Sequence, residues 1–121
     1  MKPLNILVID DEHVIRAGCR MVLGERGHAV ESRGTCREGI DAIMAETFDV
    51  ILLDMKLPDM DGTEVLKAVR DKHPEQRVVV MSGYATVKNI MNSGKLGAFD
   101  YLPKPFTDDE LVAAVERTTV R

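Results

Sequence analysis

Hydrophobic residues in this chain gather in short runs that end at polar residues. Runs of this length are typical of strands that are buried on both faces of a sheet. The clearest run covers residues 48–54, where four consecutive apolar residues lead into Asp54, and Pro58 prevents the strand from continuing far beyond it. Together with shorter and more mixed segments, these runs lead us to expect five strands, at residues 4–9, 28–32, 48–54, 77–81 and 99–102.

Between these runs, apolar residues recur at every third or fourth position, which is the repeat of an amphipathic helix. Three of the predicted helices start at a capping residue, Thr35, Asp61 or Thr107, with a glutamate three residues further on. Another starts near Glu12. The stretch 85–95 also has a helical repeat, but its asparagine, serine and glycine residues favour a helix only weakly, so we expect this helix to be the least stable.

Strands and helices therefore alternate five times along the chain, without an internal repeat or a low-complexity linker. Alternation of this kind predicts an α/β fold with a parallel sheet and helices on both faces. Of the two common doubly wound orders, five strands favour 2-1-3-4-5, the flavodoxin-like order, with its switch point between the first and third strands. The length of 121 residues predicts that residues 1–121 form a single domain.

The composition is that of an ordinary soluble globular protein, with 45% hydrophobic and 30% charged residues. The net charge of −4 argues against direct nucleic acid binding by this domain. No apolar run approaches the roughly 20 residues of a membrane span, and the acidic residues near position 12 argue against an export signal. Cys19 and Cys36 form no metal-binding motif, so we expect two reduced, buried thiols in a cytoplasmic protein.

Acidic residues stand at the ends of both strands that flank the predicted switch point. The first strand ends at Asp10 and Asp11 and the third at Asp54, so the fold should bring three carboxylates together. Like charges at close range repel each other, and a hard divalent cation with oxygen ligands, such as Mg²⁺, relieves that repulsion. Lys104 and Ser82, at the ends of the fifth and fourth strands, add a positive charge and a hydroxyl. This combination favours phosphoryl transfer with Asp54 as the nucleophile.

Four segments together show a resemblance to a known family. They read I-D-D after the first strand, L-L-D-M-K-L-P-D-M-D-G around the end of the third, M-S-G after the fourth and D-Y-L-P-K-P-F around the fifth. In this order and spacing they resemble the receiver domain of bacterial two-component response regulators, and the resemblance covers essentially the whole chain. It implies a phosphorylation-activated signalling switch that accepts a phosphoryl group on Asp54, in a Mg²⁺-dependent reaction, from a sensor histidine kinase or a phosphotransfer protein.

The resemblance also implies how such a domain acts. It is not a conventional turnover enzyme, although it assists its own phosphorylation and slow dephosphorylation. Phosphorylation changes the surface of the fourth strand, the following helix and the fifth strand, and this surface controls an output domain or a partner, with a homodimer also possible. On this basis the chain is either a stand-alone receiver or a part of a longer regulator.

The resemblance assigns a metal site to matching residues. Asp11 corresponds to the direct Mg²⁺ ligand, and Asp10 to the ligand that usually acts through water. Asp54 is also one of the residues assigned to the metal site. Lys56, two residues beyond the phosphoacceptor, corresponds to the residue whose backbone carbonyl binds the metal.

The resemblance assigns the remaining roles to residues on the fourth and fifth strands. Lys104 corresponds to the lysine that pairs with the phosphate, and Ser82 to the switch hydroxyl. Tyr101 corresponds to the aromatic residue that turns inward when that hydroxyl moves, and Pro105 to the proline whose bond to the lysine is usually cis. Tyr84, two residues after Ser82, is bulky, and we expect it to slow the attack of water on the acyl phosphate.

Two alternatives belong to other functional classes. Residues 59–63 read D-M-D-G-T, which is similar to the nucleophile motif of haloacid-dehalogenase-type phosphatases, but Leu57 and Pro58 separate this motif from the strand that should directly precede it. The same acids resemble part of an EF-hand loop, without its bidentate glutamate. A flavodoxin-like cofactor binder would need a phosphate-cradling loop after the first strand, where this chain has Asp-Asp-Glu. Both alternatives are therefore disfavoured.

Overall fold

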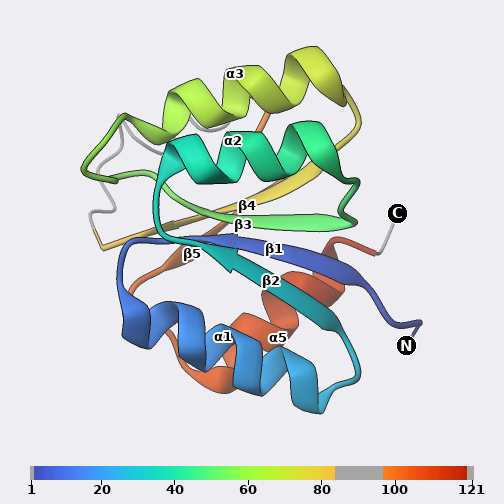
Figure 1. Cartoon of the computed structure of the whole chain (residues 1–121). Coiled ribbons are helices and arrows are strands. Elements are labelled where there is room, and N and C mark those ends of the chain that lie inside the picture. Colours follow the sequence, from blue (N-terminus) through green and yellow to red (C-terminus); the bar gives the residue numbers. More distant parts are fainter. Residues whose placement is uncertain (1, 84–96, 120–121) are drawn as a thin grey trace.

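The structure is a computed structural model that describes residues 2–83 and 97–119, and within these residues five strands form one parallel sheet (Figure 1). The strands are β1 (Asn5–Ile9), β2 (Ala29–Arg33), β3 (Val50–Asp54), β4 (Arg77–Ser82) and β5 (Asp100–Pro103). Their order is β2-β1-β3-β4-β5, which confirms the predicted flavodoxin-like topology. The helices of the described residues are α1 (His13–Glu25), α2 (Cys36–Ala45), α3 (Gly62–Lys72) and α5 (Asp108–Arg117). The predicted helix at 85–95 and Tyr84 lie outside the described residues.

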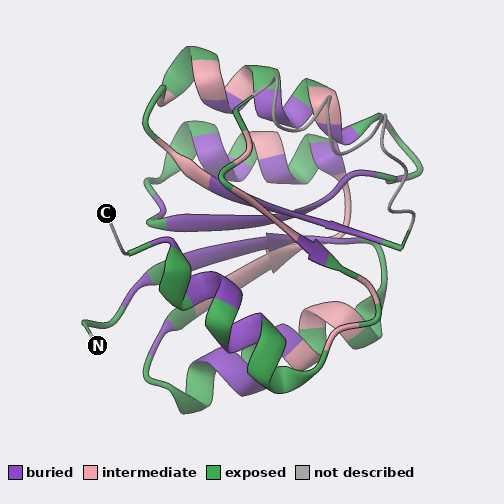
Figure 2. Cartoon of the chain, turned by 180° about the vertical axis from the view of Figure 1, so that it is seen from behind, coloured by how far each residue is buried: buried purple, intermediate pink, exposed green. Residues whose placement is uncertain are grey.

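The sheet separates two hydrophobic cores. Helices α1 and α5 cover one face and α2 and α3 the other (Figure 1). Side chains alternate along β1, so that Ile6 and Val8 pack toward α1 and α5 while Leu7 and Ile9 pack toward α2 and α3. The central strands β1 and β3 are buried almost throughout, whereas the edge strand β2 is largely half-buried (Figure 2). This burial on both faces explains the continuous apolar runs of the central strands.

The two cysteines are free thiols, and they lie in different cores. Cys19 of α1 belongs to one core and Cys36 of α2 to the other, so the sheet lies between them. Burial raises the pKa of each thiol to about 12. Both thiols are therefore protonated at neutral pH, as expected for structural cysteines.

The helix caps follow the sequence patterns with one difference. Thr107 and Glu110 form a complete capping box at α5, and the Thr35 hydroxyl accepts the Glu38 N–H of α2. At α3, however, Oδ1 of Asp61 accepts the N–H of Thr63 at 2.9 Å instead of that of the glutamate three residues on. A short aspartate side chain reaches the second amide of a helix as readily as the third, so the expected capping box is incomplete here.

A half-buried arginine connects the end of α3 to the strands that follow it. The guanidinium of Arg70 donates to the carbonyl of Pro74, to that of Gln76 at 2.6 Å and to that of Gly97 at 2.8 Å. Gly97 has a φ of +87°, and a Cβ at this position would lie 2.8 Å from Nε of Arg70. The absence of a side chain at Gly97 therefore allows the chain to pass over the guanidinium before it enters β5.

The parallel arrangement brings the carboxyl ends of the strands to one edge of the sheet. The register pairs Ile9 with Leu53 and Ser82 with Pro103. Asp54 pairs with Met81 in the same way, so the carboxyl ends of β1, β3, β4 and β5 are neighbours in space. Among the described residues, none of the helices has the length and apolar character that crossing a membrane requires.

Candidate functional site

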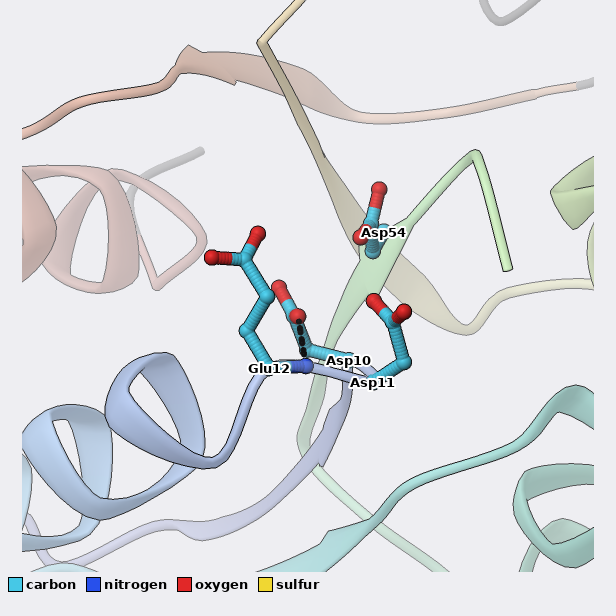
Figure 3. A group of neighbouring side chains, drawn as sticks. All are labelled: Asp10, Asp11, Glu12 and Asp54. Carbon is cyan, nitrogen blue, oxygen red and sulfur yellow. Dashed lines mark hydrogen bonds between the residues drawn. The ribbon is translucent and has the colours of Figure 1, made fainter. Parts of the chain in front are cut away.

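Four acidic residues meet at this edge of the sheet. Asp10, Asp11 and Glu12 follow β1, and Asp54 ends β3 (Figure 3). Each offers one carboxylate oxygen, and these oxygens all lie within 4.8 Å of one another. The predicted convergence of three aspartates is therefore present, and a glutamate joins them. Glu12 was not predicted as a site residue, although the run Asp-Asp-Glu directly after a buried strand was a sequence signal for it.

Lys104 contributes the positive charge of the site. Its ammonium nitrogen lies 2.6 Å from Oδ2 of Asp10, 3.1 Å from Oε1 of Glu12 and 3.2 Å from Oδ2 of Asp54. Burial by itself lowers the pKa of Lys104, but the carboxylates of Asp10, Asp54 and Glu12 outweigh it and raise the pKa overall. The lysine is therefore a permanent cation shared among three acids. The peptide bond between Lys104 and Pro105 is cis, as predicted.

Asp10 is the most deeply buried acid of the group. Its side chain is fully inaccessible, and this burial raises the pKa of its carboxyl group, while Lys104 and the Glu12 N–H act in the opposite direction. Oδ1 accepts the N–H of Glu12 at 2.9 Å (Figure 3). Oδ2 contacts Lys104 as an ion pair but accepts no well-directed hydrogen bond. This oxygen therefore retains coordinating capacity, and the donor set fits a hard divalent cation.

Asp54 is buried and is held from two sides. Its Oδ1 accepts the N–H of Lys56 at 3.1 Å, and its Oδ2 faces Lys104. Lys56 belongs to the turn between β3 and α3, where it forms an isolated antiparallel bridge with Asp61. The N–H of Gly62 closes the same turn by donating to the carbonyl of Met55 at 2.9 Å. The backbone of this turn thus fixes the carboxylate of Asp54 relative to the lysine.

Ser82 and Tyr101 are also brought together. Ser82 ends β4 and is buried. Its backbone carbonyl accepts the hydroxyl of Tyr101 at 3.2 Å and the backbone N–H of Lys104 at 2.8 Å. The half-buried Tyr101 is therefore directed toward Ser82, next to the strand end that carries Lys104.

The acids of the D-M-D-G-T motif have structural partners. The carboxylate of Asp59 accepts the N–H groups of Cys36 and Arg37 at 3.0 and 2.9 Å. These backbone hydrogen bonds lower the pKa of Asp59, and the one from the Arg37 N–H has the largest effect. Asp61 caps α3. Asp61 was predicted to be a helix cap, and the structure confirms this.

Comparisons with known proteins found matches over nearly the whole chain. The family model of the response regulator receiver domain matches residues 6–116. The chain is 37% identical over 112 residues to the DNA-binding transcriptional regulator NtrC of Escherichia coli (strain K12), covering 93% of this chain and 24% of that protein. It is 35% identical over 113 residues to sporulation initiation phosphotransferase F of Bacillus subtilis (strain 168), covering 93% of this chain and 91% of that protein.

A solved structure is similar over nearly the whole chain. It is a response regulator receiver domain protein, described as CheY-like, from Methanospirillum hungatei JF-1. Its TM-score is 0.91 at 33% sequence identity, and the match covers 96% of this chain and 93% of that one. The chain spans about a quarter of the length of the NtrC relatives that it matches.

Proposed function

The chain belongs to the response regulator receiver domain family, whose members are phosphorylation-activated signalling switches, and we propose that Asp54 accepts the phosphoryl group. One observation carries this proposal: the carboxylate of Asp54 lies beside Lys104 within a group of four acids. A phosphate on Asp54 would then meet a fixed cation at once. We further propose that residues 1–121 form a single receiver domain.

In this proposal, the residues around Asp54 support the transfer as follows. One carboxylate oxygen of Asp54 attacks the phosphorus of a phosphohistidine on a partner kinase or phosphotransfer protein. The new oxygen–phosphorus bond forms as the phosphorus–nitrogen bond breaks, and the histidine leaves with the bonding electrons and takes up a proton. Lys104 neutralises the charge that gathers on the phosphoryl oxygens, and the Lys56 N–H keeps the carboxylate in place. Water later attacks the phosphorus of the acyl phosphate, the bond to the Asp54 oxygen breaks, and inorganic phosphate leaves while Asp54 returns to its free carboxylate.

A cation completes the site in this proposal. Asp10, Asp11 and Asp54, with the backbone carbonyl of Lys56, would hold Mg²⁺, and Glu12 adds a fourth carboxylate nearby. When bound, Mg²⁺ supplies positive charge that balances the acids and the phosphoryl oxygens. The domain assists a reaction on its own residue, so it is a switch and not a conventional turnover enzyme.

The switch itself involves Ser82 and Tyr101. Phosphorylation adds negative charge and acceptor oxygens at Asp54. The hydroxyl of Ser82 then donates a hydrogen bond to the phosphoryl group, and Tyr101 packs into the space behind it. Since Tyr101 already contacts the Ser82 carbonyl, a small movement of this pair shifts the surface around β4 and β5 between two arrangements.

We propose that this surface passes the signal to an output domain or a partner, in a cytoplasmic protein, with a homodimer as one form of output. The NtrC relatives are DNA-binding transcriptional regulators about four times as long as this chain. The receiver domain itself has a net charge of −4, so any nucleic acid binding would belong to an attached domain.

The decisive experiment is incubation with acetyl phosphate and Mg²⁺, followed by intact mass measurement. We expect the wild-type protein to gain one phosphoryl group, and chelation of Mg²⁺ to prevent it. Asp54→Asn should gain none, while Asp71→Asn, an exposed acid on α3, should behave as the wild type. Phosphorylation of Asp54→Asn at the wild-type level would refute the assignment.

A further inference from the structure

The turn between β3 and α3 is anchored at its tip as well as at its base. At its base, the Lys56–Asp61 bridge and the bond from Gly62 N–H to the Met55 carbonyl close the turn. At its tip, Asp59 reaches α2, a helix that starts 23 residues earlier in the chain. Hydrogen bonds therefore connect the tip of the turn to the start of α2.

Both oxygens of Asp59 take part in this contact. Oδ1 accepts the N–H of Cys36 at 3.0 Å and Oδ2 that of Arg37 at 2.9 Å. These are the first two amides of α2, which have no acceptor within the helix. The helix's own cap, Thr35, accepts a different amide, that of Glu38. Asp59 thus anchors α2 through two charge-assisted hydrogen bonds at the positive end of the helix dipole.

A second contact joins the tip of this turn to the start of α2. The thiol of Cys36 lies 3.5 Å from the carbonyl of Met60, the residue after Asp59, and donates to it. The amide of Lys56, three residues before Asp59, donates to Oδ1 of Asp54. One short turn therefore joins the carboxylate of Asp54 to the start of α2.

We propose that Asp59 is a positioning residue for the cation site, because its anchor to α2 holds Lys56 in place against Asp54. This inference builds on the proposed function, in which the Lys56 carbonyl is a metal ligand. Asp59 itself does not touch the cation or the phosphoryl group. Its effect passes through the turn. Loss of the contact between Asp59 and α2 loosens the position of the Lys56 carbonyl, while the acids that follow β1 keep their positions.

The test is the affinity of the protein for Mg²⁺ alone, measured by isothermal titration calorimetry. Asp59→Ala loses both hydrogen-bond acceptors and should bind Mg²⁺ roughly tenfold more weakly. An effect of this size is typical when residues that orient metal ligands are removed. Asp59→Asn keeps one acceptor oxygen and should lie between Asp59→Ala and the wild type. Hydrogen exchange of the Lys56 amide should accelerate in the same order.

Two matched controls separate positioning from charge and from helix stability. Asp61→Ala removes an equal charge and a helix cap from the same turn, but leaves the anchor to α2 intact. Thr35→Ala removes the intrinsic cap of α2 without touching the turn. Both should change Mg²⁺ affinity less than threefold, and neither should accelerate exchange at Lys56.

Equal loss of affinity in Asp59→Ala and Asp61→Ala would reduce the effect to charge and overturn the inference. Equal loss in Thr35→Ala would reduce it to the stability of α2, with the same consequence. If Asp59→Ala fails to fold, Asp59→Asn decides by the same comparison. A wild-type protein that neither binds Mg²⁺ nor becomes phosphorylated would instead refute the proposed function.

Discussion

Gly62 is the position where a single added methyl group should disturb both the fold and the site. It is the first residue of α3 and is buried against the end of β3. A Cβ at Gly62 would lie 2.8 Å from Cα and 2.8 Å from Sδ of Met55, and 3.2 Å from the carbonyl oxygen of Asp54. Two of these three atoms belong to the backbone, which cannot rotate away as a side chain could.

The magnitude follows from the contact distances. Carbon atoms pack best at about 3.5–4.0 Å, so Gly62→Ala must push the turn outward by about 0.7 Å. Forcing extra volume into a packed site costs about 1–3 kcal/mol. The lower conformational entropy of alanine in the unfolded chain offsets up to about 1 kcal/mol. We therefore expect a net loss of about 1–2 kcal/mol, with Asp54 displaced as well.

Urea unfolding measures the loss in stability. A loss of this size lowers the urea midpoint by about 1 M at a typical dependence on denaturant. Phosphorylation by acetyl phosphate should slow roughly tenfold, because reaction rates depend steeply on the position of the nucleophile. Gly18→Ala in α1 is the matched control, since nothing lies within 4 Å of its Cβ position. That variant should gain up to about 1 kcal/mol and phosphorylate normally.

A Gly62→Ala protein with wild-type stability and wild-type phosphorylation would refute this reasoning. It would mean that the turn after β3 can move to make room for the methyl group without a loss of stability. Lost stability with unchanged phosphorylation would show that the displacement stays within α3 and does not reach Asp54.

Three further predictions concern residues away from the site. Arg70→Met removes the donors to three backbone carbonyls and should lower the free energy of unfolding by about 1–2 kcal/mol; an unchanged urea midpoint would contradict the role of this arginine. Burial lowers the pKa of His28 in the fold below its ordinary value of 6.5, and its Nδ1 accepts the N–H of Leu4. As the pH falls, His28 is therefore protonated in the unfolded chain before it is protonated in the fold. The stabilisation that neutral His28 gives the fold is complete above pH 6.5 and is lost as the pH falls below this value. His28→Asn should flatten the pH dependence of unfolding there, and an equally steep profile would count against it. Cys19 and Cys36, each with its pKa raised to about 12, should resist Ellman's reagent in the folded protein and both react in urea; rapid labelling without urea would show that the thiols are accessible.

Local sequence determined most of the architecture. Central parallel strands with helices on both sides are apolar throughout, and amphipathic helices repeat every three to four residues, so β1, β3, β4 and the described helices could be recognised in the chain. The edge strand β2 is only half-buried and has no such apolar run. The strand order placed Asp10 and Asp54 at one edge, because the carboxyl ends of parallel strands meet there. The site therefore followed from the ends of the strands, without knowledge of any distance.

Only the tertiary structure decided how side chains from separate loops pair. Glu12 meets Lys104 across 92 positions of sequence, and Asp59 meets the start of α2 across 23. Arg70 gathers carbonyls from two different connections. No periodicity marks such contacts, because they depend on where the packed cores set each helix relative to the sheet. The pattern of apolar residues therefore specifies which elements form, while the packing between those elements selects the polar pairs that hold the site.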